Sequence, residues 1–255
     1  MKDIHLFGIT TPVGQSFREI FCKLSLKNNI FLYSRNGPPY IKYDLEKPNS
    51  LIVEKFNRKS VIVSFAPIWQ IANFLKYINS FDKKIFNYID TVIVMSSTSV
   101  ITKRFSTNDF DKNLFNKLNH AETYLTYLSK KFNFKLSIVR PTLIYGEINN
   151  YFDQNISKIG KLMKMSPLIF IPKETGLRQP IHIKQLGELV FHVYDILNKN
   201  NTFPEILEVG GDCTLSYYKM ICLIRDNLVK TKKIRFCWII RVPNKIFYLL
   251  TFPIY

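Results

Sequence analysis

The sequence predicts an α/β protein with a doubly wound parallel sheet and a small C-terminal lobe, and three observations support this. Short apolar segments alternate with segments of helical periodicity through most of the 255 residues, an order typical of parallel strands joined by helices. The first apolar segment runs into a turn with a glycine at each end, Gly8 and Gly14. The segment at 91–95 is apolar throughout, as expected of a strand buried on both faces.

The same periodicity places the individual elements. After a first strand at 4–7, a helix is expected over 15–27, where apolar residues recur three and four positions apart. Further strands are expected at 30–33, just before 43, and at 61–67, 91–95, 136–141, 168–171 and 206–209. Further helices are expected at 69–81, 111–131, 156–164 and 185–198, followed by one that Thr214 caps and that runs to Val229. We expect a core domain over 1–146 and a smaller lobe over 147–255 that is interleaved with the last core elements.

The glycine turn is the first candidate site. At a strand–turn–helix junction of an α/β sheet, backbone N–H groups and the helix N-terminus can face the pyrophosphate of a dinucleotide. Thr11 stands where the usual pattern has its middle glycine, and an ordinary turn whose glycines serve only the bend is the alternative. The candidate pyrophosphate residues are Gly8, Thr10, Thr11, Pro12, Val13 and Gly14.

The strand ends that follow suggest the rest of a dinucleotide site. The second strand ends in Ser34 and Arg35 and lacks an acidic residue there, which suits the 2′-phosphate of NADP, with NAD left open. A solvated loop arginine is the alternative. Asp44, followed by Leu45, is expected to contact the adenine or to cap a helix. The loop expected to pass over the pyrophosphate is Phe65, Ala66 and Pro67.

A run of hydroxyl groups, Ser96 to Ser99, follows the central strand. Such folds keep their ligands at the carboxyl ends of central strands. Serine and threonine also cap helices and turns, so the run is either part of a site or a local cap.

Composition narrows the class of function. The net charge of +17 suits an anionic partner, but the lysines read as spread over the surface and no nucleic-acid-binding motif is present, so we expect no nucleic acid partner. Four dispersed cysteines and the lack of a signal peptide favour a cytoplasmic protein. The apolar residues 246–255 are expected to pack on the domain, to meet a partner subunit, or to contact the inner surface of a membrane.

The motifs occur in an order that resembles a known family. The matching segments are Gly8–Gly14, Tyr43–Leu45, Val94–Thr98, Ile138–Gly146, Arg178–Ile183 and Glu208–Gly211, the last followed by Leu215–Tyr217. Together they are similar to the extended or atypical short-chain dehydrogenase/reductase superfamily, specifically its NAD-dependent epimerase/dehydratase family, with its nucleoside-diphosphate-sugar epimerases. The resemblance implies a Rossmann-like dinucleotide-binding core and a substrate-binding lobe.

The resemblance also implies roles for single residues. Ser97 falls at the position of the family's catalytic hydroxyl, and Ser96 and Pro141 are expected beside the cofactor. Arg178 falls where the family's enzymes can meet a substrate diphosphate, a contact suited to a guanidinium. Thr98, Tyr145 and Asn155 are expected to complete the substrate site, and no metal ligand set is expected.

The sequence departs from the family pattern at the proton-transfer pair, and this leaves two hypotheses about function. Active members use a Tyr-x-x-x-Lys pair for proton transfer, and counting back from Ala121-Glu122 places Leu114 and Leu118 at those positions. Tyr127 and Lys131 repeat the spacing too late on the helix. The first hypothesis is an NADP-dependent epimerase, dehydratase or reductase acting on a nucleotide-linked or lipid-linked sugar, as a monomer or a homodimer. The second is a catalytically degenerate dinucleotide-binding protein that acts through partner subunits.

Overall fold

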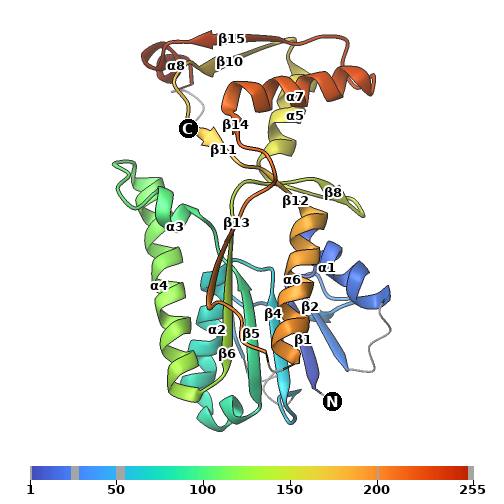
Figure 1. The fold of residues 1–255 in the computed structure, drawn as a ribbon, viewed down its shortest axis with the longest axis vertical. Helices are drawn as coiled ribbons and strands as arrows, with labels where there is room; N and C mark the ends of the chain where they lie inside the picture. The colour runs from blue at the N-terminus through green and yellow to red at the C-terminus, as the bar shows by residue number, and fades with distance from the viewer. Residues whose placement is uncertain (1, 24–28, 50–54, 200, 252–255) are drawn as a thin grey trace. The chain divides into compact units, whose positions relative to one another are not determined.

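The computed structural model describes residues 2–23, 29–49, 55–199 and 201–251 (Figure 1). The chain forms two compact units. Unit 1 contains residues 1–142, 147–151 and 183–209, and unit 2 contains residues 143–146, 152–182 and 210–255. The chain therefore leaves unit 1 after the sixth strand of its sheet, returns briefly for residues 147–151, and returns again for one helix and one last strand.

The sheet of unit 1 has seven strands in the order β13-β6-β5-β4-β1-β2-β3, and every neighbouring pair is parallel. The strand order changes direction beside β1, which creates the crevice where open α/β sheets bind ligands. The strands are β1 (Asp3–Phe7), β2 (Ile30–Ser34), β3 (Ile41–Lys42), β4 (Ser60–Ser64), β5 (Ile89–Met95), β6 (Lys135–Pro141) and β13 (Ile206–Val209).

Helices cover both faces of this sheet (Figure 1). Helices α1 (Pro12–Lys23) and α6 (Ile183–Asn198) pack against each other on one face, where a Cβ on Gly187 of α6 would lie 2.5 Å from the Ser16 hydroxyl of α1. Helices α2 (Ile68–Phe81) and α4 (Asp109–Phe132) pack together on the other face. The short helices η2 (Lys83–Asn87) and α3 (Ser99–Thr102) complete unit 1.

Unit 2 is built from a two-stranded parallel sheet and two helices. Strands β10 (Leu168–Pro172) and β15 (Trp238–Val242) pair in parallel. Helices α5 (Ile156–Met165) and α7 (Tyr217–Lys230) share a small apolar core with one side of that pair. The other elements are β7 (Ile144–Tyr145), β9 (Tyr151–Phe152), β11 (Leu177–Arg178), β12 (Ile181–His182), β14 (Leu215–Ser216) and α8 (Asn244–Thr251), with β8 (Glu147–Ile148) preceding β9 in unit 1.

The predicted fold class is confirmed, and the predicted elements are present with shifted ends. Helix α1 begins at Pro12 instead of 15, and residues 24–27 of the expected helix lie outside the described residues. The cap assigned to Thr214 is wrong: Ser216 caps α7 by accepting a hydrogen bond from the Lys219 N–H at 3.2 Å. The helix starts later because residues 215–216 are extended and pair with β11.

Candidate functional site

The turn after β1 requires glycine at its first position. Gly8 has φ of +68°, a conformation that L side chains rarely adopt. A Cβ at Gly8 would lie 2.4 Å from the backbone nitrogen of Ala66. The backbone of the turn therefore packs directly on the loop that follows β4.

Thr11 replaces the middle glycine of the usual pattern with a side chain that closes the turn on itself. Its hydroxyl donates to the Gly8 carbonyl at 2.8 Å and accepts from the Gly14 N–H at 3.1 Å. Pro12, the first residue of α1, has no N–H. The next three residues each have a backbone N–H. Those of Gly14 and Gln15 donate to Thr11, and that of Val13 has no recorded partner among the described residues. The helix N-terminus can thus hold an anion, but with fewer backbone donors than an unsubstituted glycine turn offers.

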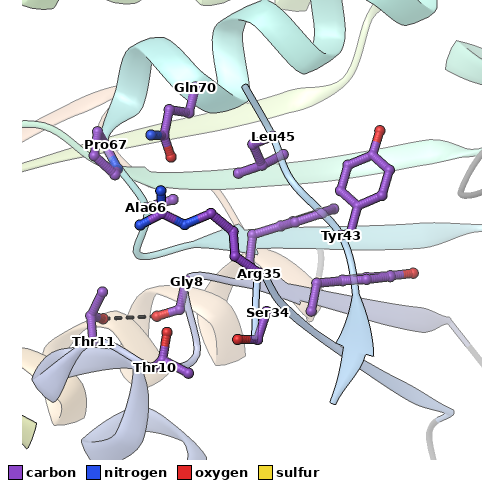
Figure 2. Close-up of a pocket in the computed structure, with 12 residues that line it drawn as sticks. Gly8, Thr10, Thr11, Ser34, Arg35, Tyr43, Leu45, Ala66, Pro67 and Gln70 are labelled. Atoms are coloured by element: carbon purple, nitrogen blue, oxygen red, sulfur yellow. Dashed lines mark hydrogen bonds between the residues drawn. The ribbon is translucent and has the colours of Figure 1, made fainter. Parts of the chain in front are cut away.

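A pocket opens beside this turn, at the carboxyl ends of β1, β2 and β4 (Figure 2). Its cavity volume is about 90 Å³, small against the ~300–1,000 Å³ of pockets that enclose a drug-sized ligand. It therefore fits one part of a dinucleotide, with the rest on the open surface. It is lined by Phe7, Gly8, Thr10, Thr11, Tyr33, Ser34, Arg35, Tyr43, Leu45, Ala66, Pro67 and Gln70.

Eight residues predicted to bind the dinucleotide thus line one pocket, and Arg35 supplies its positive charge. The Arg35 side chain reaches from the end of β2 across the pocket toward Ala66 and Pro67 (Figure 2). It is exposed, and no hydrogen bond or ion pair of its guanidinium is recorded among the described residues. Ser34 lies beneath it, and its hydroxyl accepts from the Asn36 N–H at 3.2 Å.

Sequence reasoning missed four lining residues: Phe7, Tyr33, Tyr43 and Gln70. The two tyrosines and Phe7 are buried, and they lie at or just after the ends of β1, β2 and β3, which was the available signal. Burial raises the pKa of Tyr33 above its ordinary value, and burial likewise raises the pKa of Tyr43. Both tyrosines therefore stay protonated at neutral pH and do not act as bases.

Other predicted cofactor residues lie outside this lining. Pro12, Val13 and Gly14 form the first turn of α1, and Phe65 is buried. The Asp44 carboxylate accepts from the Glu46 N–H at 3.0 Å, so it closes a local turn, and no helix begins there among the described residues.

The hydroxyl run after β5 is held to the neighbouring strand and helix. Ser96 donates to the Glu122 carboxylate at 2.5 Å, and the Thr98 N–H donates to the Pro141 carbonyl at 3.1 Å. The hydroxyl of Ser97 lies 3.0 Å from that of Ser99 and accepts from the Ser99 N–H at 3.1 Å. Ser97 therefore starts the α3 turn, and its hydroxyl would have to leave Ser99 to meet a ligand.

A buried ion pair anchors this region. Glu122 of α4 is only 5% exposed and accepts from Arg140 of β6 through Nε at 3.1 Å and a second guanidinium nitrogen at 2.5 Å. Arg140 also donates to Glu208 at 3.1 Å. Hydrogen bonding to Glu122 raises the pKa of Arg140 above its ordinary value, so Arg140 stays charged throughout the neutral range.

The positions of the family's proton-transfer pair carry core residues. Leu118 is buried in the cluster between α4 and the sheet, and Leu114 packs against the same cluster. Tyr127, the tyrosine of the displaced spacing, is half exposed, with the Lys131 ammonium 5.3 Å from its ring centre. Leu114 and Leu118 therefore offer no acid or base at these two positions.

The predicted substrate residues other than Thr98 belong to unit 2. The Tyr145 ring meets the His182 ring edge-on, with centres 5.1 Å apart. Asn155 is exposed beside the first turn of α5. Arg178 is exposed, stacks 5.9 Å from the Tyr217 ring centre and donates to the Leu177 carbonyl at 3.0 Å. Most of its donors therefore face outward.

The parallel sheet, its covering helices and the glycine turn define a Rossmann-type α/β protein. The chain is similar to UDP-glucuronic acid 4-epimerase from Bacillus cereus solved with UDP-glucuronic acid and NAD, at 16% identity and a TM-score of 0.68, over 95% of this chain and 86% of that one. It is similar to UDP-N-acetylglucosamine 4-epimerase from Bacillus cereus at 13% identity and a TM-score of 0.66, over 94% and 86%. It is also similar to GDP-mannoheptose C4 reductase from Campylobacter jejuni with NADP bound, at 12% identity and a TM-score of 0.66, over 97% and 92%.

No family model matches the sequence, and no curated protein matches it. At these identities the structural likeness establishes the fold alone, which is that of these two epimerases and this reductase. The fold implied by the ordered motifs is confirmed. Among the described residues, no cluster of three or more metal-ligating side chains is present, and no helix has the length and hydropathy needed to cross a bilayer.

Proposed function

We propose that this protein binds a nicotinamide dinucleotide at the Gly8 turn and acts as an epimerase, dehydratase or reductase on a nucleotide-linked or lipid-linked sugar. One observation carries the proposal. Eight residues selected from the sequence for dinucleotide binding line a single pocket at the carboxyl ends of three parallel strands. This is the place where open α/β sheets bind nucleotides.

The chemistry of the lining supports NADP over NAD. The guanidinium of Arg35, which reaches across the pocket, and the hydroxyl of Ser34 suit a 2′-phosphate, and none of the described lining residues is an acid that could accept the 2′-hydroxyl of NAD. The Val13 N–H and the positive end of α1 suit the pyrophosphate. Ala66 and Pro67 would cover the dinucleotide from the β4 side.

A bound nicotinamide would supply hydride transfer, and the chain would supply binding and orientation. The exposed guanidinium of Arg178 suits the diphosphate of a nucleotide sugar. The Ser97 hydroxyl, once released from Ser99, can donate to an oxygen of the sugar. Thr98, Tyr145 and Asn155 are proposed as further substrate contacts.

A second candidate function is dinucleotide binding without catalysis, in a protein that works through partner subunits. The apolar residues Leu114 and Leu118 favour it, because they leave the helix without the usual proton donor and its lysine. The two candidates share the dinucleotide site and differ in turnover.

Cofactor binding is tested by thermal unfolding of the whole chain with NADPH and with NADH. A ligand at one hundred times its dissociation constant raises the free energy of unfolding by about 2.7 kcal/mol. We expect Arg35→Ala to weaken NADPH binding at least about tenfold, since one charge-assisted hydrogen bond contributes ~1.5–3 kcal/mol, and to leave NADH binding unchanged. Arg58→Ala, at another exposed arginine of unit 1, is the control. Failure of both nucleotides to stabilise the protein contradicts the proposed site.

Turnover separates the two candidates. The protein loaded with reduced or oxidised dinucleotide is incubated with UDP-, GDP- and dTDP-linked sugars while nicotinamide absorbance and sugar products are followed. Turnover that Ser97→Ala abolishes and Ser106→Ala retains supports the enzyme. Tight dinucleotide binding with no turnover on any of these sugars supports the binding protein.

A further inference from the structure

One surface of unit 2 is apolar although it faces away from the core. Along β10 and β15, alternate side chains point toward helices α5 and α7, and Ile169 and Ile239 are among those packed there. The opposite set forms three cross-strand pairs, Leu168 with Trp238, Phe170 with Ile240 and Pro172 with Val242. We call these six residues the outer face. All six are apolar, whereas a sheet with one solvated face normally alternates apolar and polar residues.

The centre of this outer face is open to solvent. Trp238 is 69% exposed, Ile240 is 42% exposed and Phe170 is 41% exposed. Phe236, just before β15, and Ile246 of α8 are also exposed, at 54% and 48%. Contiguous exposed apolar patches of this kind mark interaction sites on soluble domains. Figure 1 shows α5 and α7 on one side of the strand pair, with α8 at its end.

Positive charge surrounds the outer face at both ends of the strands. Lys173 follows β10, and its N–H donates to the Val242 carbonyl at 2.9 Å; Lys245 lies in the first turn of α8. Arg235 precedes Phe236, and all three cations are exposed. Arg241 stacks on Tyr218 of α7 with its guanidinium 4.7 Å from the ring centre, so it lies at the border of the sheet on the helix side.

The whole of unit 2 carries this bias. It holds 13 lysines and arginines against four acidic residues, which is +9 of the total net charge of +17, although it is the smaller unit. Asp153 is buried at the start of α5 and Asp226 is paired with Arg225. Glu174 and Asp212 are exposed, and Glu174 follows Lys173 directly, so one acidic side chain lies among the cations at that end of the strands. The lysines and arginines are distributed over both units, in keeping with the sequence expectation, and the excess charge of unit 2 follows from its few acidic residues.

We propose that the outer face docks unit 2 on a bilayer surface that contains anionic lipids. A tryptophan and phenylalanines beside aliphatic residues suit the interfacial layer of a membrane, and a rim of lysine and arginine suits acidic headgroups. The contact is peripheral, in keeping with the described helices, none of which could span a bilayer. The proposal differs from the expected membrane contact of residues 246–255, because its centre lies on β10 and β15, and it does not depend on dinucleotide binding.

The test is co-sedimentation of the full chain with vesicles of phosphatidylcholine alone or of equal parts phosphatidylcholine and phosphatidylglycerol. We expect binding to the anionic vesicles, and a loss of about fivefold in affinity for each cation removed in Lys173→Gln or Lys245→Gln. Binding should fall further in ~1 M salt, where charges are screened beyond ~3 Å. In a Trp69→Phe background Trp238 is the remaining tryptophan, and its emission should move to shorter wavelength when vesicles are added.

Two variants separate the outer face from general attraction of a basic protein. Trp238→Asp should lower vesicle affinity at least about tenfold, since burial of one large apolar side chain contributes ~1.5–3 kcal/mol. Phe105→Asp changes a side chain of unit 1 that is 87% exposed and should leave the affinity unchanged. Equal binding by both variants, or no binding of the wild-type chain to anionic vesicles, overturns the proposal.

A second copy of the chain is the competing occupant, and the same variants identify it. Sedimentation velocity without lipid, over a range of concentrations, should show that Trp238→Asp leaves the oligomeric state unchanged. A wild-type dimer that Trp238→Asp converts to a monomer would assign the outer face to self-association and overturn the lipid proposal. Thermal unfolding and circular dichroism confirm that each variant is folded. Ile240→Asp repeats the test at the next cross-strand residue pair of the outer face.

Discussion

His5 makes the stability of unit 1 depend on pH in a way that can be calculated. The side chain is fully buried in β1, three residues before Gly8, and its ring stacks 4.1 Å from the Phe56 ring and 4.9 Å from the Phe31 ring, centre to centre. Nδ1 lies 2.9 Å from the Tyr33 hydroxyl, and Nε2 has no hydrogen-bond partner among the described residues. Burial, with a smaller contribution from the charge of Lys55, lowers the pKa of His5 from 6.5 to about 3.

The sign of the effect follows from proton uptake. Between pH 6.5 and pH 3 the unfolded chain binds a proton at His5 and the folded chain does not, so stability falls as pH falls through this window. At pH 5 the difference in pKa amounts to a loss of about 2 kcal/mol relative to pH 8, from this residue alone. The full contribution is reached near pH 3, below which both states are protonated.

The assay is urea unfolding at several values of pH between 8 and 5 for the wild type and for His5→Phe, which keeps the aromatic stack and removes the titrating group. The variant loses the partner of the Tyr33 hydroxyl, but that cost is the same at every pH. We therefore expect the wild type to lose about 2 kcal/mol more than the variant on going from pH 8 to pH 5. His192→Gln, at an exposed histidine of α6, should keep the wild-type slope. Parallel curves for the wild type and His5→Phe would refute the reasoning.

Two further predictions concern the surroundings of the site, and both use urea unfolding. Glu122→Ala leaves the guanidinium of Arg140 without its buried partner and should lower the free energy of unfolding by about 3 kcal/mol. The control Asp195→Ala, in an exposed ion pair on α6, should lower it by less than ~1 kcal/mol. Equal losses in the two variants would show that the buried pair stabilises the protein no more than an exposed one. Gly8→Ala places a side chain in the left-handed region and a Cβ 2.4 Å from the Ala66 nitrogen. It should therefore lower the free energy of unfolding by more than ~2 kcal/mol and abolish dinucleotide binding. The control Gly37→Ala also has a left-handed backbone, but its Cβ would make an ordinary contact at 3.6 Å, so it should cost only ~1 kcal/mol. An equally tolerated Gly8→Ala would show that the two loops separate freely.

The centre of the sheet of unit 1 was predictable because β4 and β5 are buried on both faces, so residues 61–63 and 92–95 form uninterrupted apolar segments. Gly8 was predictable from the local chain path, because a strand that passes directly into a helix needs a backbone conformation that side chains disfavour. The strand ends then placed Ser34 and Arg35 beside that turn, because parallel strands bring their carboxyl ends to one edge of the sheet. Arg35 and Gly8 now line the same pocket.

Features that depend on how individual side chains are oriented in the folded protein were not predictable. Nothing in the sequence indicates that the Thr11 hydroxyl bridges Gly8 and Gly14, because that contact depends on the side-chain rotamer within the turn. Strand β15 was missed because its outer side chains are apolar, so the segment lacks the alternation that identifies a half-buried strand. The same apolar pattern that concealed the strand is the basis of the proposed membrane-docking surface.

The chemistry open to this site is limited by how α4 is held. Leu118 and Glu122 are one turn apart on the same side of the helix, the first in the core and the second bonded to Arg140 and Ser96. Turning the helix to present another side chain to a ligand would expose Leu118 and break the buried pair, which costs several kcal/mol. A proton donor cannot therefore come from this face of α4. Since burial also raises the pKa of Tyr33 and of Tyr43, a reaction at neutral pH must take its proton from solvent, from substrate or from a side chain on another element.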